Sequence, residues 1–330
     1  MKKLILTFLT LFLLLAPRLW ASEMDTIPLT FESEGHTLKG RLLLPKNRTG
    51  KVPVILFFVG SGGNSSYATD YRNFLQFFLK SPLENEPVSF LFFDKRGVGE
   101  SEGKWQNTDF LQRALDGKNA ALHIKDHPDI DAERIYVVGH SQGGWIVQIC
   151  LSEYPELFAG GISMAGPTFD VKKQLINDYQ SAFICNKDLA PEKALKKAKR
   201  RVNRDLTIIS LFPLQENWKQ LKVIRKFDPK EYLLNVKKPL LLLFAENDRL
   251  VNPEWSLEHL RELYPNGFPD NFTYHIAAGE NHSFKTSPFC FKGAWSDLKF
   301  SENTRDVMAD WIKNEIGNVQ EAGIRSKTAN

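Results

Sequence analysis

The sequence is poor in cysteine and carries little net charge. Three cysteines occur among 330 residues, and none forms a C-x-x-C pair, which excludes a dithiol redox motif and a cysteine-rich zinc site. No Gly-Lys-Ser/Thr follows a glycine-rich turn, so a P-loop is excluded. A net charge of +4 leaves no strong general attraction for nucleic acid. With 42% hydrophobic and 25% charged residues, the composition suits a soluble protein with a large core.

Long apolar runs are also missing, apart from one near the N-terminus. The run Leu4–Ala16 follows the basic head Met1–Lys3 and precedes the small pair Ala21–Ser22. This order predicts a signal peptide over residues 1–21 and export to the periplasm or the medium, because the run is short for a membrane span. An uncleaved anchor is the alternative. Removing the peptide lowers the net charge from +4 to +1, since three basic and no acidic residues precede Glu23.

The cysteines differ in their surroundings. Cys150 lies in an apolar helical pattern and is expected in the core. Cys185 and Cys290 can pair in an oxidising compartment, but their spacing does not determine their distance. A disulfide and two free thiols therefore both remain open.

Short apolar runs alternate with longer amphipathic segments. This alternation predicts an α/β fold with a mostly parallel central sheet flanked by helices. The predicted strands are 37–44 (antiparallel), 52–59, 88–93, 134–139, 158–164, 240–244 and 271–276. The predicted helices are 71–79, 108–123, 141–154, 253–263 and 303–316. The core is expected to comprise residues 22–168 and 237–320, followed by a flexible polar tail, 321–330.

Residues 169–236 interrupt this alternation. They lack a convincing central strand and are rich in Lys, Leu and Ala, which predicts a helical cap over the strand ends where ligands bind in open α/β sheets. The basic stretch Lys193–Arg204 is expected to be a solvated helix face, with attraction of an anionic substrate or membrane surface as the alternative. Four aromatic side chains could pack the cap helices or line an apolar pocket: Tyr179, Phe183, Phe212 and Trp218.

The stretch Val137–Gly144 (VVGHSQGG) gives the main functional signal. Ser141 lies between a predicted strand and a predicted helix. Gly139 and Gly143 flank it at two-residue spacing, because side chains there would clash where strand and helix converge. This G-x-S-x-G nucleophile elbow exposes the hydroxyl at the sheet edge and at a helix N-terminus.

A serine nucleophile requires a base, and His282 fits best among the seven histidines. It lies in the loop Ala277–Phe284, which follows the last predicted strand at the edge where the nucleophile emerges. His140 adjoins the serine but is expected to point the other way. His123 and His127 have helix-face spacing but lack the glutamate of H-E-x-x-H, so a surface location is expected. The other histidines lie in strand or helix patterns: His36, His259 and His275.

The acid that orients the base should follow another strand, between serine and histidine in chain order. The run Leu240–Phe244 is that strand, and Asp248 in the following loop is the preferred acid. Glu246, closer to the strand end, is the competitor.

The oxyanion of such a reaction needs two backbone N–H donors. Gln142, directly after the nucleophile, is predicted to supply one. Ser61 is predicted to supply the other, because the glycine-rich loop Val59–Gly63 follows an earlier strand and lets backbone amides approach a substrate. No metal or cofactor is expected.

Together, these residues resemble the α/β-hydrolase superfamily over roughly Thr30–Ile316. The segment Asp94–Ser101 (DKRGVGES) is similar to the family's D-x-R-G-x-G-x-S segment, which implies a structural role beside the active site. The resemblance implies Ser141 as nucleophile, Asp248 as orienting acid and His282 as base.

The chain departs from the family at one position. The oxyanion loop often carries histidine before its first glycine, whereas this chain has Val59, so another group must brace the loop. Within the superfamily, the layout is most similar to secreted bacterial esterases and the serine-aminopeptidase-like branch.

The predicted function is hydrolysis of a small-molecule carboxylic ester through an acyl-enzyme. A peptidase or amidase, and a thioesterase or acyltransferase, are alternatives with the same three residues. A non-catalytic binding protein on a hydrolase frame is the alternative from another class. Acyl length, alcohol group and oligomeric state stay open.

Overall fold

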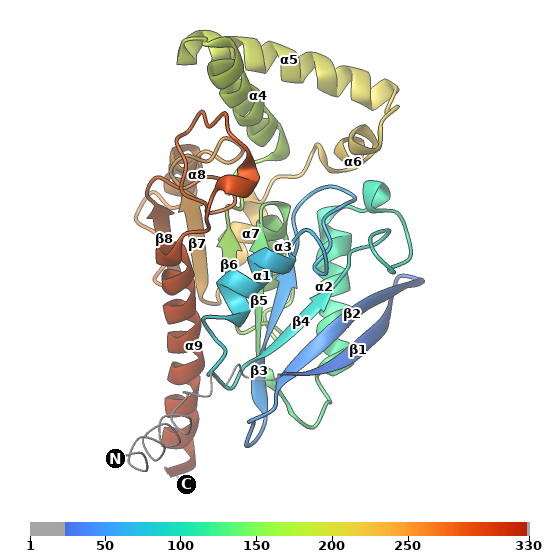
Figure 1. The fold of residues 1–330 in the computed structure, drawn as a ribbon, viewed down its shortest axis with the longest axis vertical. Coiled ribbons are helices and arrows are strands. Elements are labelled where there is room, and N and C mark those ends of the chain that lie inside the picture. Colours follow the sequence, from blue (N-terminus) through green and yellow to red (C-terminus); the bar gives the residue numbers. More distant parts are fainter. Residues whose placement is uncertain (1–23, 329–330) are drawn as a thin grey trace, which may run out of the picture.

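The structure, a computed structural model, describes residues 24–328 (Figure 1), and the predicted signal peptide lies outside them. Within these residues, eight strands form one sheet in the order β1-β2-β4-β3-β5-β6-β7-β8. The strands are β1 (Met24–Ser33), β2 (His36–Pro45), β3 (Val52–Phe58), β4 (Ser89–Phe93), β5 (Ile130–His140), β6 (Gly160–Met164), β7 (Leu240–Ala245) and β8 (Phe272–Ala277). Only β1 with β2 and β2 with β4 pair antiparallel. The predicted mostly parallel sheet is confirmed.

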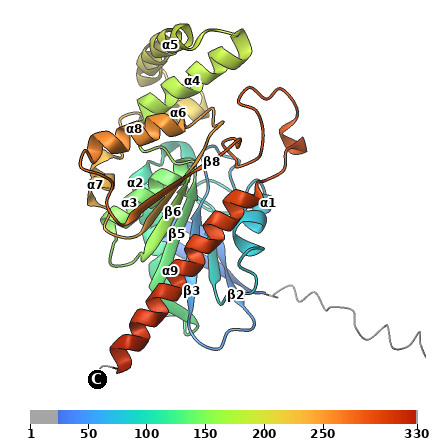
Figure 2. The ribbon, with the colours of Figure 1, turned by 90° about the vertical axis from the view of Figure 1, so that its left-hand side faces the viewer.

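Helices cover both faces of this sheet (Figures 1 and 2). They are α1 (Arg72–Leu75) with the π-helical turn η1 (Gln76–Lys80), α2 (Phe110–Ile124), α3 (Gln142–Glu153), α4 (Val171–Lys187), α5 (Pro191–Leu211), α6 (Glu216–Ile224), α7 (Lys230–Asn235), α8 (Pro253–Leu263) and α9 (Glu302–Thr328). The two short 3-10 turns are η2 (Trp105–Asn107) and η3 (Trp295–Asp297). Within residues 24–328, no helix combines the length and apolar content that crossing a bilayer requires.

The central strands are apolar throughout because both of their faces are buried. In β3, Val54, Leu56 and Phe58 belong to the core on the side of α2 and α3. The intervening residues Ile55 and Phe57 belong to the core on the side of α1 and α9. This arrangement places the carboxyl ends of the six parallel-paired strands, β3 to β8, at one edge of the sheet.

Two sequence expectations need correction. Strand β1 was not predicted, although Ile27, Leu29 and Phe31 alternate with polar residues as a half-buried strand requires. Its place directly after the predicted cleavage site hid this pattern. The second concerns the C-terminus, where α9 continues to Thr328 and helical structure therefore extends into residues 321–330, which were predicted as a flexible tail.

The inserted segment 169–236 is helical, and α4, α5 and α6 lie above the carboxyl edge of the sheet (Figures 1 and 2). The segment returns to the core before residue 236, because Leu233 of α7 and the preceding Ile224 are buried in the core cluster of α2 and α3. A disulfide joins Cys185 of α4 to Cys290 in the segment after β8, which resolves the pairing left open by the sequence. Cys150 is free and buried.

Three of the four aromatic residues considered in the cap have clearly different surroundings: Tyr179, Phe183 and Phe212. Tyr179 and Phe183 stack on each other along α4, and the Tyr179 hydroxyl donates to Asp205 of α5 at 3.0 Å. These two residues therefore pack the cap helices together. Phe212 is instead 62% exposed.

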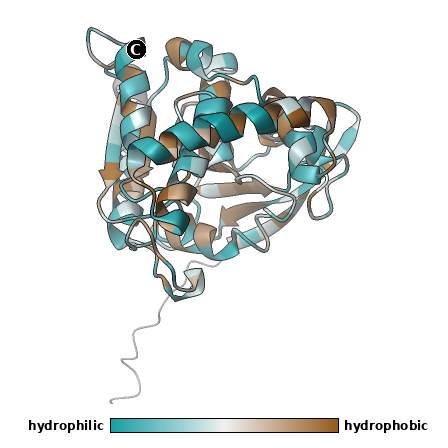
Figure 3. Ribbon diagram, turned by 90° about the horizontal axis from the view of Figure 1, so that it is seen from above, coloured by the Kyte–Doolittle hydropathy of each residue, from teal (hydrophilic) through white to brown (hydrophobic). Residues whose placement is uncertain are grey.

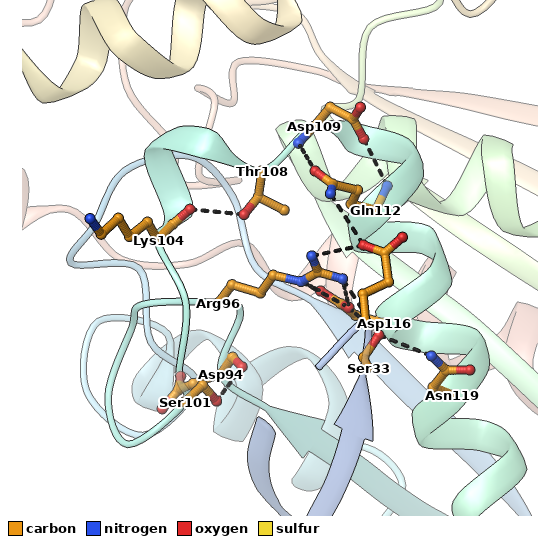
Figure 4. A network of polar contacts seen from close by, with 11 residues as sticks. Ser33, Asp94, Arg96, Ser101, Lys104, Thr108, Asp109, Gln112, Asp116 and Asn119 are labelled. Carbon is orange, nitrogen blue, oxygen red and sulfur yellow. Dashed lines mark hydrogen bonds and ion pairs between the residues drawn. The ribbon is translucent and has the colours of Figure 1, made fainter. Parts of the chain in front are cut away.

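The segment Asp94–Ser101 forms the network shown in Figure 4. Arg96 donates through Nη2 to Asp116 Oδ1 of α2 at 2.6 Å, and both side chains are at most 3% exposed. The Ser101 hydroxyl donates to the Asp94 carbonyl at 2.7 Å. A Cβ at Gly99, whose φ is +57°, would lie 2.2 Å from Asp94 Oδ2. These contacts tie the loop to α2 and hold its two ends together, in agreement with a structural role.

Candidate active site

The strand β5 ends in a strained turn that carries Ser141. This serine has φ +58° and ψ −120°, a left-handed conformation that non-glycine residues adopt only where the surroundings impose it. Its N–H donates to the Met164 carbonyl of β6 at 2.8 Å, and its carbonyl accepts from Gly144 at 2.9 Å. The hydroxyl is thereby placed at the N-terminus of α3.

The two flanking glycines are required by close contact. A Cβ at Gly139 would lie 2.1 Å from the Gly143 carbonyl oxygen, and a Cβ at Gly143 would lie 2.2 Å from the Phe58 carbonyl oxygen. Neither neighbour can move, because each is backbone of a buried element. The elbow therefore forms only without side chains at these two positions.

Asp248 and His282 meet at the same edge. Nδ1 of His282 lies 2.7 Å from Asp248 Oδ2, and Asp248 is 1% exposed. The other carboxylate oxygen accepts from the amides of Leu250 at 2.7 Å and Val251 at 2.9 Å. With both oxygens occupied, the carboxylate holds the imidazole in the tautomer whose Nδ1 is protonated and whose Nε2 can accept a proton.

The competing carboxylate, Glu246, does not reach the histidine ring. It accepts from the Gly279 amide at 2.7 Å and so braces the loop that precedes His282. Asn247 supports the same loop, because its side-chain amide donates to the Ser287 carbonyl at 2.8 Å. The structure thus pairs Asp248 with His282 and gives Glu246 a positioning contact.

Three side chains brace the glycine-rich loop in place of the family's histidine. Lys95 donates to the Gly60 carbonyl at 2.7 Å, and Arg113 donates to the Val59 carbonyl at 2.6 Å. The Tyr71 hydroxyl accepts from the Gly60 amide at 2.9 Å. Burial lowers the pKa of Lys95 well below its usual value and that of Arg113 to about 10.

His140 links this loop to the His282 loop. The Tyr71 hydroxyl lies 2.7 Å from His140 Nδ1, and His140 Nε2 lies 2.8 Å from the His282 carbonyl oxygen. Because that oxygen only accepts, Nε2 carries the proton, Nδ1 accepts, and Tyr71 donates. Burial, with a smaller contribution from His282, lowers the pKa of His140 to about 3. A neutral His140 therefore joins the two loops in one directed chain of hydrogen bonds.

Ser141 lines a cavity of about 360 Å³ between the sheet edge and the cap. Ser61 and Gln142, the predicted oxyanion donors, line it as well, as do Leu250 and Val251 after the acid. The cap contributes residues of α4 and α6 to the opposite wall: Gln174, Leu175, Asp178, Asn217, Gln220 and Leu221. The cavity thus brings the predicted nucleophile, both predicted oxyanion donors and the cap together.

The remaining histidines lie elsewhere. His259 Nδ1 is 2.6 Å from the Thr168 carbonyl, and His127 Nδ1 accepts from Asp129 at 3.2 Å. His123 is exposed on α2, and its ring centroid lies 6.3 Å from that of Phe31. None of the three is among the residues described around the cavity.

Comparison with known proteins agrees with this geometry. Residues 66–225 match the family described as "Serine aminopeptidase, S33". Among solved structures, the α/β-hydrolase GrgF of Penicillium sp. sh18 superposes with a TM-score of 0.59 at 17% identity, covering 89% of this chain and 99% of that one. The chain has the α/β-hydrolase fold. This family match and fold support hydrolase activity.

Two further solved structures are similar, and one of them is described as an esterase. An esterase of Pyrococcus furiosus has a TM-score of 0.56 at 20% identity, covering 79% of this chain and 84% of that one. Est1E of Butyrivibrio proteoclasticus, in a complex with ferulic acid, has a TM-score of 0.57 at 16% identity, covering 88% and 99%. At these identities the likeness of the α/β-hydrolase to either protein is one of fold.

Sequence reasoning missed several residues of this site. Trp145 lines the cavity, and its position four residues after Ser141 on α3 was a usable signal, since such residues share a helix face. Tyr71, Lys95 and Arg113 gave no such signal, because their partners lie on other elements.

We expect Tyr71→Phe to lower kcat toward a nitrophenyl ester about 10-fold to 100-fold. The change leaves the Gly60 amide without its acceptor and His140 Nδ1 without its donor, and an unpaired buried polar group costs roughly 1–3 kcal/mol. The matched control is Tyr136→Phe, whose hydroxyl contacts the Glu315 carbonyl of α9 instead. Equal kcat values in the two variants would contradict the bracing role of Tyr71.

The stability of the α/β-hydrolase should fall with acidification because of His140. Its pKa is about 3 when folded and near 6.5 when unfolded, so below pH 6.5 the unfolded chain binds the extra proton. The lowered folded-state pKa therefore removes stability as the pH falls from 6.5, by at most about 1.4 kcal/mol per pH unit. Urea unfolding should show that the free energy of unfolding falls less between pH 7 and pH 5 in His140→Gln than in the wild type. An equal fall in both proteins would contradict the assignment to His140.

Proposed function

We propose that this chain is a serine hydrolase that cleaves carboxylic esters through an acyl-enzyme intermediate. The observation that carries the proposal is the juxtaposition at one sheet edge. Ser141 occupies a strained elbow on the cavity wall, and the His282–Asp248 pair is bonded to the elbow through His140. A strained serine and an oriented imidazole at the same sheet edge are the groups that nucleophilic acyl transfer requires.

In the proposed mechanism, Ser141 Oγ attacks the acyl carbon while His282 Nε2 accepts the hydroxyl proton. Asp248 stabilises the imidazolium through Nδ1. The amides of Ser61 and Gln142 stabilise the negative oxygen of the tetrahedral intermediate. The intermediate collapses, the carbon–oxygen bond to the alcohol breaks, and His282 returns the proton to the leaving alkoxide. A water molecule, deprotonated by His282, then releases the acid and regenerates Ser141.

Ester hydrolysis is preferred because one of the structures similar to this chain is described as an esterase and another is described with bound ferulic acid, a carboxylic acid of the kind that ester cleavage releases. The family description, serine aminopeptidase, favours a peptidase as the second candidate. Both reactions use the same three residues. They differ in the leaving group, since an amine departs only after protonation by the imidazolium, whereas an alkoxide is a better leaving group.

We expect Ser141→Ala to lower kcat/KM toward a short-chain nitrophenyl ester at least about 10³-fold, because the alanine has no nucleophilic oxygen. His282→Ala should lower it to a similar extent, since residues that act as a unit are not additive. Ser152→Ala, at the other end of α3, is the matched control and should retain wild-type rates. A fluorophosphonate probe should label the wild type at Ser141 and leave Ser141→Ala unlabelled. Hydrolysis at equal rates in the wild type and Ser141→Ala would favour a binding protein.

The preference for an alcohol or an amine leaving group can be tested directly. We expect the wild type to hydrolyse nitrophenyl esters with a larger kcat/KM than aminoacyl nitroanilides, relative to the uncatalysed rate of each compound. Asp248→Asn should remove both activities, because both need an oriented His282. A larger rate enhancement with the nitroanilides than with the esters, which Asp248→Asn also removes, would identify a peptidase instead.

We also propose that the protein is exported. The apolar N-terminal run predicts a signal peptide. The disulfide between Cys185 and Cys290 supports an oxidising compartment, where such bonds persist.

A further inference from the structure

The outer edge of the cap exposes several large apolar side chains in a short stretch. At the end of α5 and in the turn to α6, Ile208 is 38%, Leu211 66%, Phe212 62% and Leu214 80% exposed. The stretch 208–214 is called the cap tip below. The other exposed large apolar residues of the described chain are distributed over α2, α6, β8 and η3: Leu111, Leu122, Val223, Tyr274 and Trp295. Grouped apolar exposure of this kind marks a contact surface.

The cap tip is not part of the face that α5 packs inward. That face is formed by Ala194, Ala198, Val202 and Ile209, each at most 2% exposed. Leu211, Phe212 and Leu214 therefore lie outside the apolar area that the cap needs for its own packing. Their exposure is additional to the amphipathic pattern that holds α5 in place.

The outer side of α5 is strongly basic. Arg201 and Arg204 pair with Asp205, and Lys197 lies 4.9 Å from the centre of the Phe183 ring. Four further cations are exposed and have no ion-pair partner within residues 24–328: Lys193, Lys196, Lys199 and Arg200. With 3.6 residues per turn, Lys193, Lys196 and Arg200 share the outward side with Leu211.

Helix α5 lies at one end of the molecule's longest axis, across that axis, above the rest of the cap (Figures 1 and 2). Figure 3 looks down on this end, where the helix is largely hydrophilic. Its long side can therefore meet a flat surface without interference from the sheet domain. The cap tip leads directly into α6, whose residues line the cavity, so a surface bound there would lie beside the substrate-binding part of the cap.

We propose that the outer side of α5 and the cap tip dock on an anionic phospholipid surface. Lys193, Lys196 and Arg200 would contact headgroup phosphates, and Phe212 and Leu214 would insert between the headgroups. A basic helix face and exposed apolar side chains are the two signals that together bind a protein to an interface. The positive charge of this side favours a phospholipid surface over a second copy of this chain, because two copies would bring the same cations against each other.

The test measures insertion at the cap tip itself. A polarity-sensitive dye on Leu214→Cys of the full chain should shift to the blue with phosphatidylglycerol vesicles and not with phosphatidylcholine vesicles, while the same dye on Leu122→Cys of α2 should not respond. Selective labelling is possible because Cys150 is buried and the other two cysteines are bonded. High salt should weaken the response.

Two variants test the basic side of α5 and the apolar cap tip separately, and each has a matched control. Lys193→Gln/Lys196→Gln/Arg200→Gln should reduce the vesicle affinity reported by the dye at least tenfold, whereas Lys51→Gln/Lys125→Gln/Lys237→Gln, which removes three exposed cations elsewhere, should leave it unchanged. Phe212→Ser should also weaken binding, and Tyr274→Ser should not. A dye that responds equally to both vesicle types, or a concentration-dependent dimer that Phe212→Ser abolishes, would overturn the proposal. Ester turnover is not measured, so the result is independent of the proposed function.

Discussion

The close approach of β5 and α3 to β3 is the constraint on which the site depends. Gly143 lies against the backbone of Phe58, and Gly139 lies against Gly143. Only this contact lets the chain reverse within one residue, and the reversal forces Ser141 into a positive φ. The cost of that conformation is met by burial of the strand and helix on both sides. The same contact sets the glycine-rich loop after β3 beside the serine.

The loops around the elbow come from distant parts of the chain, and buried polar side chains hold them in register. The chain of hydrogen bonds from Gly60 through Tyr71 and His140 to the His282 carbonyl spans the loops after β3 and β8. Such a chain is stable only when every member is paired, because a buried polar group without a partner is costly. It keeps the proposed oxyanion donors and the proposed base in one rigid frame, which favours preorganised catalysis.

The cap has two distinct sides with different chemistry. Its inner side presents amide, carboxylate and apolar groups to the cavity, including Gln174, Asp178 and Leu221. Its outer side presents unpaired cations and the cap tip. The disulfide from Cys185 to Cys290 ties α4 to the segment that follows the proposed base, so the cap and the loop of His282 are covalently linked. Substrate selection and surface binding would thus reside in one element, while the chemistry resides in the sheet domain.

The sequence by itself determined the α/β architecture and the elbow, because apolar periodicity and the Gly139–Gly143 spacing are local properties of the chain. It also identified Asp248 and His282 as candidates from their places after strands, although Glu246 remained a competitor. Only the tertiary structure placed Asp248, rather than Glu246, against His282, paired Cys185 with Cys290, and showed that Tyr71, Lys95, Arg113 and His140 brace the loops around Ser141. These contacts join residues tens to more than a hundred positions apart, and no short-range pattern encodes which distant side chains a folded sheet brings together.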